Sequence, residues 1–207
     1  MSANTSEIKN LLFDFGGVII DIDYNRVKKA FEDLGMEDVR AFYQHDDHSR
    51  LVEDFEKGLI TEDQFRNAII AEMPGNISYQ DFDDAWNRIL LTVPPQRVEM
   101  LEKLQKKYNL YLLSNTNIIH YRKYTEDFQK QYGKSLNSLF TKAYYSHEIL
   151  LRKPNPEIFN FVLKDAGIVA SETLFVDDSE LNIEAAEKVG LKTLYKSQHN
   201  EVADYFK

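Results

Sequence analysis

Short apolar runs, each followed by polar or small residues, recur along the chain and alternate with longer helical patterns. Such runs are typical of buried strands, and strands that alternate with helices predict a parallel sheet. Three helical patterns are followed by Asn109, Gly167 or Gly190, where left-handed C-caps are expected. We predict an α/β fold with a doubly wound parallel sheet. The expected strands are residues 11–15, 110–113, 143–145, 173–176 and 193–195.

The alternation is interrupted between about Asp23 and Leu91, where several helical patterns occur without a convincing strand. Thr61-Glu-Asp-Gln64 has the sequence of a capping box, and Ser78 can open another helix. Pro94-Pro95 marks the return to the sheet. We therefore expect a core made of residues 1–22 and 93–207, with residues 23–92 inserted into it as an α-helical cap.

Composition excludes several classes of protein. The 207 residues are 43% hydrophobic, which suits one core domain that carries an insertion. With 34 acidic and 25 basic residues the net charge is −9, so neither nucleic acid nor an anionic membrane is an expected partner. The sequence has no cysteine, which excludes disulfides, thiolate nucleophiles and cysteine-ligated metals. No signal-peptide pattern or long apolar stretch is present, so a cytoplasmic location is expected, while the oligomeric state stays open.

Chemically useful side chains follow four of the expected strands. In an open parallel sheet, ligands gather at the carboxyl ends of the strands, so these side chains are expected to form one site. The four segments are Asp14-Phe-Gly-Gly17, Ser114-Asn-Thr-Asn117, Arg152-Lys-Pro154 and Asp177-Asp-Ser179.

Three carboxylates in one site need a cation. Two unit charges about 4 Å apart repel by about 4 kcal/mol at an effective dielectric near 20, so Asp14, Asp177 and Asp178 are not expected to cluster alone. An all-oxygen set of ligands favours Mg²⁺. With the charge reduced, Asp14 can attack the phosphorus of a phosphate ester. Lys153 supplies a second positive charge, and the Ser114 hydroxyl can bind phosphoryl oxygens.

In this order, the four segments resemble the motifs of the haloacid dehalogenase superfamily of hydrolases, and the resemblance covers nearly the whole chain. It implies that Asp14 is the nucleophile of a phosphatase that acts on a small phosphorylated metabolite. It also implies that Ser114 and Asn115 bind the phosphoryl group and that Lys153 stabilises its charge.

The same resemblance implies that Asp177 and Asp178 complete the magnesium site with Asp14, and that the backbone carbonyl of Gly16 is a further metal ligand. The helical insert is similar to the small cap of one branch of these enzymes. A narrower resemblance is to bacterial sugar-phosphate phosphatases of the α-D-glucose-1-phosphate phosphatase type. It is carried by Asp14-x-Gly-x-Val18, Asp21-Ile-Asp23, Phe55-Glu-Lys-Gly58-x-Ile60, Ser114-Asn-Thr-Asn117 and Arg152-Lys-Pro154.

Gly16 departs from the pattern, because most phosphatases of the superfamily have an aspartic acid there that protonates the leaving group. Loss of a general acid typically lowers a rate by about 10² to 10⁴. The preferred hypothesis is a phosphatase whose leaving group needs little protonation, as the anomeric hydroxyl of a sugar 1-phosphate would. Alternatively, the proton comes from another acid, the candidates being Asp21, Asp23, His45 and His48.

Two other hypotheses stay open. A haloacid dehalogenase also lacks an acid at position 16, but it works without a metal and does not need the Asp177-Asp178 pair. A phospho-ligand sensor would keep the pocket without turnover. Glu56 and Gly58 are interpreted as shaping the cap, and Ser179 as an N-cap.

Overall fold

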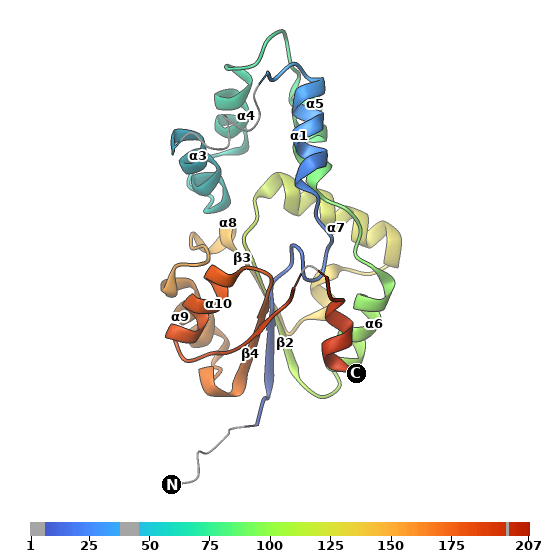
Figure 1. The fold of residues 1–207 in the computed structure, drawn as a ribbon, viewed down its shortest axis with the longest axis vertical. Coiled ribbons are helices and arrows are strands. Elements are labelled where there is room, and N and C mark those ends of the chain that lie inside the picture. Colours follow the sequence, from blue (N-terminus) through green and yellow to red (C-terminus); the bar gives the residue numbers. More distant parts are fainter. Residues whose placement is uncertain (1–6, 38–45, 198) are drawn as a thin grey trace.

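The fold is a three-layer α/β core with a helical unit beyond the carboxyl ends of its strands (Figure 1). It is described from a computed structural model that covers residues 7–37, 46–197 and 199–207. Five strands form a parallel sheet, as predicted, and lie in the order β3-β2-β1-β4-β5. The strands are β1 (Asn10–Phe13), β2 (Asn109–Ser114), β3 (Lys142–Tyr145), β4 (Thr173–Asp177) and β5 (Lys192–Tyr195).

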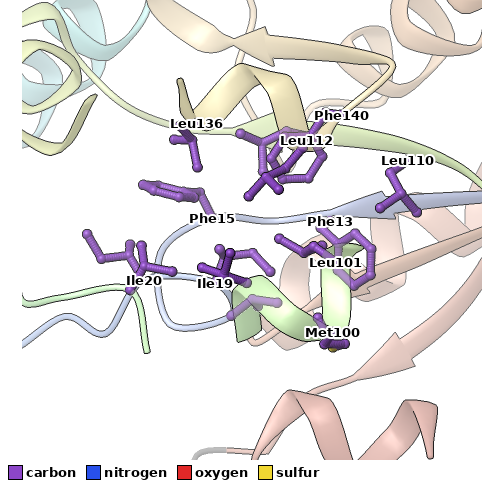
Figure 2. Close-up of a cluster of buried hydrophobic side chains, with 14 of the residues drawn as sticks. Phe13, Phe15, Ile19, Ile20, Met100, Leu101, Leu110, Leu112, Leu136 and Phe140 are labelled. Carbon is purple, nitrogen blue, oxygen red and sulfur yellow. The ribbon is translucent and has the colours of Figure 1, made fainter. Parts of the chain in front are cut away.

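The two faces of the sheet bury different residues of the same strands, because successive side chains point to opposite faces. Leu11 and Phe13 lie in one buried cluster, which is completed by α6 (Pro95–Leu104), α7 (Ile118–Tyr132) and the C-terminal segment. Figure 2 shows Phe13 in this cluster with Leu101 of α6. Leu12 belongs to the other cluster, which α9 and α10 complete. The helices of the core are α6 (Pro95–Leu104), α7 (Ile118–Tyr132), α8 (Ser146–Ile149), α9 (Pro156–Ala166) and α10 (Glu180–Lys188), with the 3-10 helices η2 (Leu136–Leu139), η3 (Ala170–Glu172) and η4 (Val202–Phe206).

The inserted segment has a separate aromatic core. Phe55 stacks on Phe65 with ring centroids 4.1 Å apart, and Phe82 and Trp86 pack edge-on against Phe65. Figure 1 shows these helices above the carboxyl ends of the strands. We propose that they are the cap predicted for residues 23–92. They are α1 (Tyr24–Asp33), α3 (Asp46–Glu56), α4 (Glu62–Ile70), α5 (Tyr79–Trp86) and the 3-10 helix η1 (Asn87–Ile89).

The two connections between the core and the helical unit run antiparallel, side by side. The Leu91 amide donates to the Asp21 carbonyl at 3.0 Å, and the Asp23 amide donates to the Ile89 carbonyl at 2.9 Å. Arg97 reinforces the junction from α6, since its Nη1 lies 2.9 Å from Asp21 Oδ1 and its Nε lies 2.7 Å from Glu201 Oε1. The insertion therefore leaves and re-enters the core at one point.

Most of the predicted helix ends are confirmed. The capping box of Thr61 and Gln64 is present, and the Ser78 side chain accepts from the Asp81 amide at the start of α5. Gly167 is the left-handed C-cap of α9, and Gly190 also has a positive φ just beyond α10. The prediction for Asn109 is wrong, because α6 ends earlier and Asn109 is the first residue of β2.

Ser179 lies at the N-cap position of α10, but its side chain makes no capping hydrogen bond. Its amide instead donates to Asp177 Oδ1 at 2.8 Å. Among the helices that the structure describes, none is long and apolar enough to cross a membrane.

Candidate active site

The three carboxylates predicted for the site, those of Asp14, Asp177 and Asp178, lie together at the carboxyl ends of the strands. Asp14 directly follows β1, Asp177 ends the neighbouring β4, and Asp178 comes next. Because β1 and β4 pair in parallel with Phe13 opposite Val176, the two strands deliver their acids to the same point. One oxygen from each of Asp14, Asp177 and Asp178 can be chosen so that all lie within 4.8 Å of one another. Residues far apart in sequence thus form one acidic cluster.

Lys153 reaches into this cluster from the loop between α8 and α9. Its side chain is 1% exposed, and its Nζ donates to Asp14 Oδ1 at 2.6 Å and to Asp177 Oδ2 at 2.7 Å. Burial alone would lower the pKa of Lys153, but the two carboxylates outweigh burial and raise that pKa. The lysine is therefore a permanent cation between the two acids.

The surroundings of Asp14 alter its protonation. Burial raises the pKa of Asp14 from 3.8 to about 7, Lys153 opposes the shift, and the charge of Asp177 adds to it. Burial and Asp177 also raise the pKa of Asp178. A single lysine does not balance two buried carboxylates and a half-buried one, and this excess of negative charge favours a further cation.

Asn115 positions Lys153. Its Nδ2 donates to the Lys153 carbonyl and its Oδ1 accepts from the Lys153 amide, both at 2.9 Å. The side-chain amide is therefore engaged with backbone, and phosphate binding by Asn115 stays a prediction. Ser114, buried at the end of β2, lies on the wall of a neighbouring cavity together with Gly16. Both were predicted as site residues, and both reach this surface.

Gly17 is required by both backbone conformation and space. Its φ is +72°, and a Cβ at this position would lie 2.1 Å from Asp178 Oδ2. The left-handed conformation and the close approach of the carboxylate both favour glycine. At Gly16, in contrast, a Cβ would meet no atom nearer than 3.7 Å. The turn after β1 is thus shaped around Asp178.

A cavity of about 590 Å³ lies beside the acidic cluster and is lined by both the core and the helical unit. Its volume is in the range of pockets that hold small molecules. The core supplies Gly16, Ser114 and Asn115, and the helical unit supplies a largely apolar wall that includes Val52 and Trp86. Phe15 and Gly16, which directly follow Asp14 in the sequence, both line the cavity, so it adjoins the acidic cluster.

Arg152 joins the core to the helical unit above the cavity. Its Nη1 lies 2.9 Å from Glu53 Oε1 and its Nη2 lies 2.9 Å from Glu56 Oε2, both on α3. The turn after α3 also touches the core, since a Cβ at Gly58 would lie 2.2 Å from the carbonyl oxygen of His147. Gly58 therefore shapes the cap as expected, whereas Glu56 also lines the cavity.

Sequence reasoning missed His120, which links the turn after β2 to the helical unit. Its amide donates to Asn117 Oδ1 at 3.0 Å, its Nδ1 lies 3.1 Å from Asn117 Nδ2, and its Nε2 lies 3.1 Å from the Trp86 carbonyl. Since a carbonyl only accepts, Nε2 carries the proton and Nδ1 accepts. Burial lowers the pKa of His120 to about 4, so the ring is neutral. An asparagine three residues before a histidine at a helix start was the available signal.

The candidate replacement acids lie away from the cavity or outside the described structure. Asp21 pairs with Arg97, and Asp23 caps α1 by accepting from the Asn25 amide at 2.9 Å. Neither is among the residues that line the cavity. The His45 position and the side chain of His48 lie outside the described part of the chain.

The model of one protein family, described as haloacid dehalogenase-like hydrolase, matches residues 8–190. The chain belongs to this family. This match confirms the resemblance noted in the sequence.

The chain is similar to relatives from Bacteroides thetaiotaomicron. A D-ribitol-5-phosphate phosphatase is 35% identical over 187 residues, which is 90% of each chain. A crystal structure of an enzyme of the family has a TM-score of 0.93 at 36% identity, covering 98% of this chain and all of that one. The wild-type form of that enzyme, in complex with magnesium and inorganic phosphate, has a TM-score of 0.87 at 36% identity, covering 97% of this chain and all of that one.

Proposed function

We propose that the protein is a magnesium-dependent phosphatase of a small phosphorylated metabolite, with a sugar or sugar-alcohol phosphate as the substrate class. The observation that carries the proposal is the cluster of Asp14, Asp177 and Asp178, of which the first two are buried, with Lys153 bonded to both of these. The D-ribitol-5-phosphate phosphatase supports the substrate class, and the magnesium and phosphate complex supports the cofactor. The narrower likeness to glucose-1-phosphate phosphatases stays a prediction.

The residues present suit Mg²⁺. The three carboxylates offer hard oxygen ligands within 4.8 Å of one another, and the charge that they carry exceeds that of Lys153. We propose that these side chains and the Gly16 carbonyl hold the ion. When bound, Mg²⁺ would offset the negative charge of the phosphate and of the acids around it.

In the proposed mechanism a carboxylate oxygen of Asp14 attacks phosphorus, the bond from phosphorus to the ester oxygen breaks, and the departing alkoxide takes a proton from solvent water to leave as the alcohol. Water then attacks phosphorus of the aspartyl-phosphate, the bond from phosphorus to the Asp14 oxygen breaks, and the water proton passes to solvent, which releases inorganic phosphate and restores the Asp14 carboxylate. Lys153 holds Asp14 Oδ1, so the attacking group is fixed in position before the substrate binds. Ser114 donates its hydroxyl to a phosphoryl oxygen, and Asn115 keeps Lys153 in place through the backbone.

The proposal is tested by phosphate release from a panel of sugar, sugar-alcohol and nucleoside phosphates, with Mg²⁺ or with a chelator. We expect release that needs Mg²⁺ and that Asp14→Asn abolishes. Tight binding of a sugar phosphate without release over hours would favour the sensor hypothesis. Halide release from a haloacid without Mg²⁺ would favour the dehalogenase. A cytoplasmic location and the lack of nucleic-acid or membrane partners stay predictions.

A further inference from the structure

Glu56 stands out in the wall of the cavity, because it is the single carboxylate among the described residues that line it. It is the last residue of α3, and its side chain is 20% exposed. Much of the surrounding wall is apolar, formed by Ile20, Ile22, Val52, Trp86, Ile89 and Leu90. The wall also includes Lys28, whose Nζ lies 3.6 Å from Glu32 Oε1 on α1. A charged side chain in such a wall is costly unless it meets a partner, so its presence calls for an explanation.

The ion pair with Arg152 uses one part of the hydrogen-bonding capacity of the Glu56 carboxylate. The ion pair joins Arg152 Nη2 to Glu56 Oε2 at 2.9 Å. Burial raises the pKa of Glu56, and Arg152 opposes that shift. A carboxylate accepts up to about four hydrogen bonds, so Glu56 keeps acceptor capacity toward a molecule in the cavity.

The position of Glu56 is tied to the acidic cluster through consecutive residues of one loop. Arg152 holds Glu56, Lys153 holds Asp14, and Asn115 fixes the backbone of Lys153. Figure 1 shows the end of α3 above α8, on the same side of the molecule as this loop. Glu56 is therefore held on the cavity wall relative to the atom that we propose attacks phosphorus.

We infer that Glu56 is a specificity-determining residue that accepts hydrogen bonds from hydroxyl groups of the alcohol part of the substrate, an inference that rests on the proposed function. An acceptor-only, negatively charged group selects for donors and against a second anion. The substrate class is thus a phosphomonoester with a neutral, polyhydroxylated carbon chain. Esters that carry a carboxylate or a second phosphate are disfavoured.

The competing explanation is that Glu56 merely fastens the cap to Arg152. Glu53 separates the two explanations, because it pairs with the same guanidinium at the same 2.9 Å but is 47% exposed and does not line the cavity. Glu53→Gln and Glu56→Gln are therefore matched variants. Both weaken the contact with Arg152, and only the second changes the cavity wall.

The test compares two probes in the full-length protein with Mg²⁺: D-ribitol 5-phosphate and n-pentyl phosphate. Both are five-carbon esters of a primary alcohol, and they differ in their hydroxyl groups. We expect Glu56→Gln to lower kcat/KM for ribitol 5-phosphate about tenfold to a hundredfold, the cost of losing a charged hydrogen bond, mainly through KM. In Glu56→Gln, kcat/KM for n-pentyl phosphate should change less than about twofold. In Glu53→Gln, kcat/KM should change by the same factor for both probes. Phosphoglycolate, which carries a second anion, should become a better substrate of Glu56→Gln.

Equal losses on both five-carbon probes would overturn the inference, since they would assign Glu56 to fastening the cap or to protonating the leaving group. An unchanged preference would also overturn it. Calorimetry of ribitol 5-phosphate binding in the Asp14→Asn background gives a readout that does not need turnover. If the wild type releases no phosphate but Glu56→Gln still weakens this binding, the proposed function fails and the role of Glu56 stands.

Discussion

Arg152 and Lys153 are adjacent in sequence, yet they bind acids in different parts of the molecule. Arg152 pairs with Glu53 and Glu56 on α3, whereas Lys153 donates to Asp14 and Asp177 at the edge of the sheet. One loop thus connects the residues proposed for selectivity with those proposed for chemistry. A shift of this loop is expected to alter both.

Replacement of Lys153 by methionine should lower the free energy of unfolding and abolish phosphate release. The variant leaves Asp14 and Asp177 buried without their cation, which typically costs about 3 to 5 kcal/mol. Urea unfolding at pH 7 without Mg²⁺ measures the effect. Lys142→Met is the control, because Lys142 pairs with Asp165 at the surface and should cost about 1 kcal/mol or less. Equal destabilisation by the two variants would contradict the role given to Lys153.

Asn115→Ala tests whether this side chain positions the lysine. It removes the two 2.9 Å bonds to the Lys153 backbone, and a misplaced catalytic group can lower a rate about a hundredfold. We expect kcat to fall about 10- to 100-fold with a small change in KM. If KM rises and kcat is unchanged, Asn115 binds the substrate instead. Asn200→Ala, at an exposed amide bonded to the Tyr205 hydroxyl, serves as control.

Gly17→Ala should weaken the response to Mg²⁺, because the added Cβ would displace the Asp178 carboxylate. The Mg²⁺ concentration for half-maximal phosphate release should rise at least about tenfold. Gly75→Ala is the matched control, since Gly75 also has a positive φ, of +85°, but no atom lies within 4 Å of its added Cβ. That control isolates the backbone cost, about 1 to 2 kcal/mol. An unchanged Mg²⁺ requirement in Gly17→Ala would exclude Asp178 from the metal site.

His120→Gln should make stability less sensitive to acid. The pKa of His120 in the folded protein, about 4, lies below the ordinary 6.5. The stabilisation by the neutral ring is therefore present above about pH 6.5 and is lost as the pH falls toward 4. This group contributes at most about 3.5 kcal/mol to that loss, because each pKa unit is worth about 1.4 kcal/mol. Glutamine can donate and accept but does not titrate in this range.

Tm measured between pH 7 and pH 4.5 should fall less in His120→Gln than in the wild type. Parallel curves would show that His120 does not control the acid response. His199→Gln, at an exposed position near the C-terminus, should reproduce the wild-type curve.

The sheet and the acidic cluster were predictable because their signals are local. Each strand is a short apolar run, and parallel topology brings the residues after those runs to one edge. Asp14, Asp177 and Asp178 could therefore be placed together before any coordinates were known. The capping box of Thr61 and Gln64 and the N-cap at Ser78 were predictable for the same reason, since a cap needs only residues three positions apart.

Contacts between the core and the helical unit were not predictable in this way. The pairing of Arg152 with Glu53 and Glu56, and the bond from His120 to the Trp86 carbonyl, join residues on separate elements whose distance depends on tertiary packing. Asn115 is a related case. An asparagine at this position is compatible with phosphate binding, and its hydrogen bonds to the Lys153 backbone are evident only in the folded structure. The side chains that choose a substrate are therefore harder to identify than those that react with it.

The antiparallel connections at Asp21 and Leu91 have an evolutionary consequence. Because the inserted helices leave and return at neighbouring points, a different insertion of any length can replace them without rerouting a single strand. Exchange of the inserted helices would then change the residues around the cavity, while the residues at the carboxyl ends of the strands stay the same.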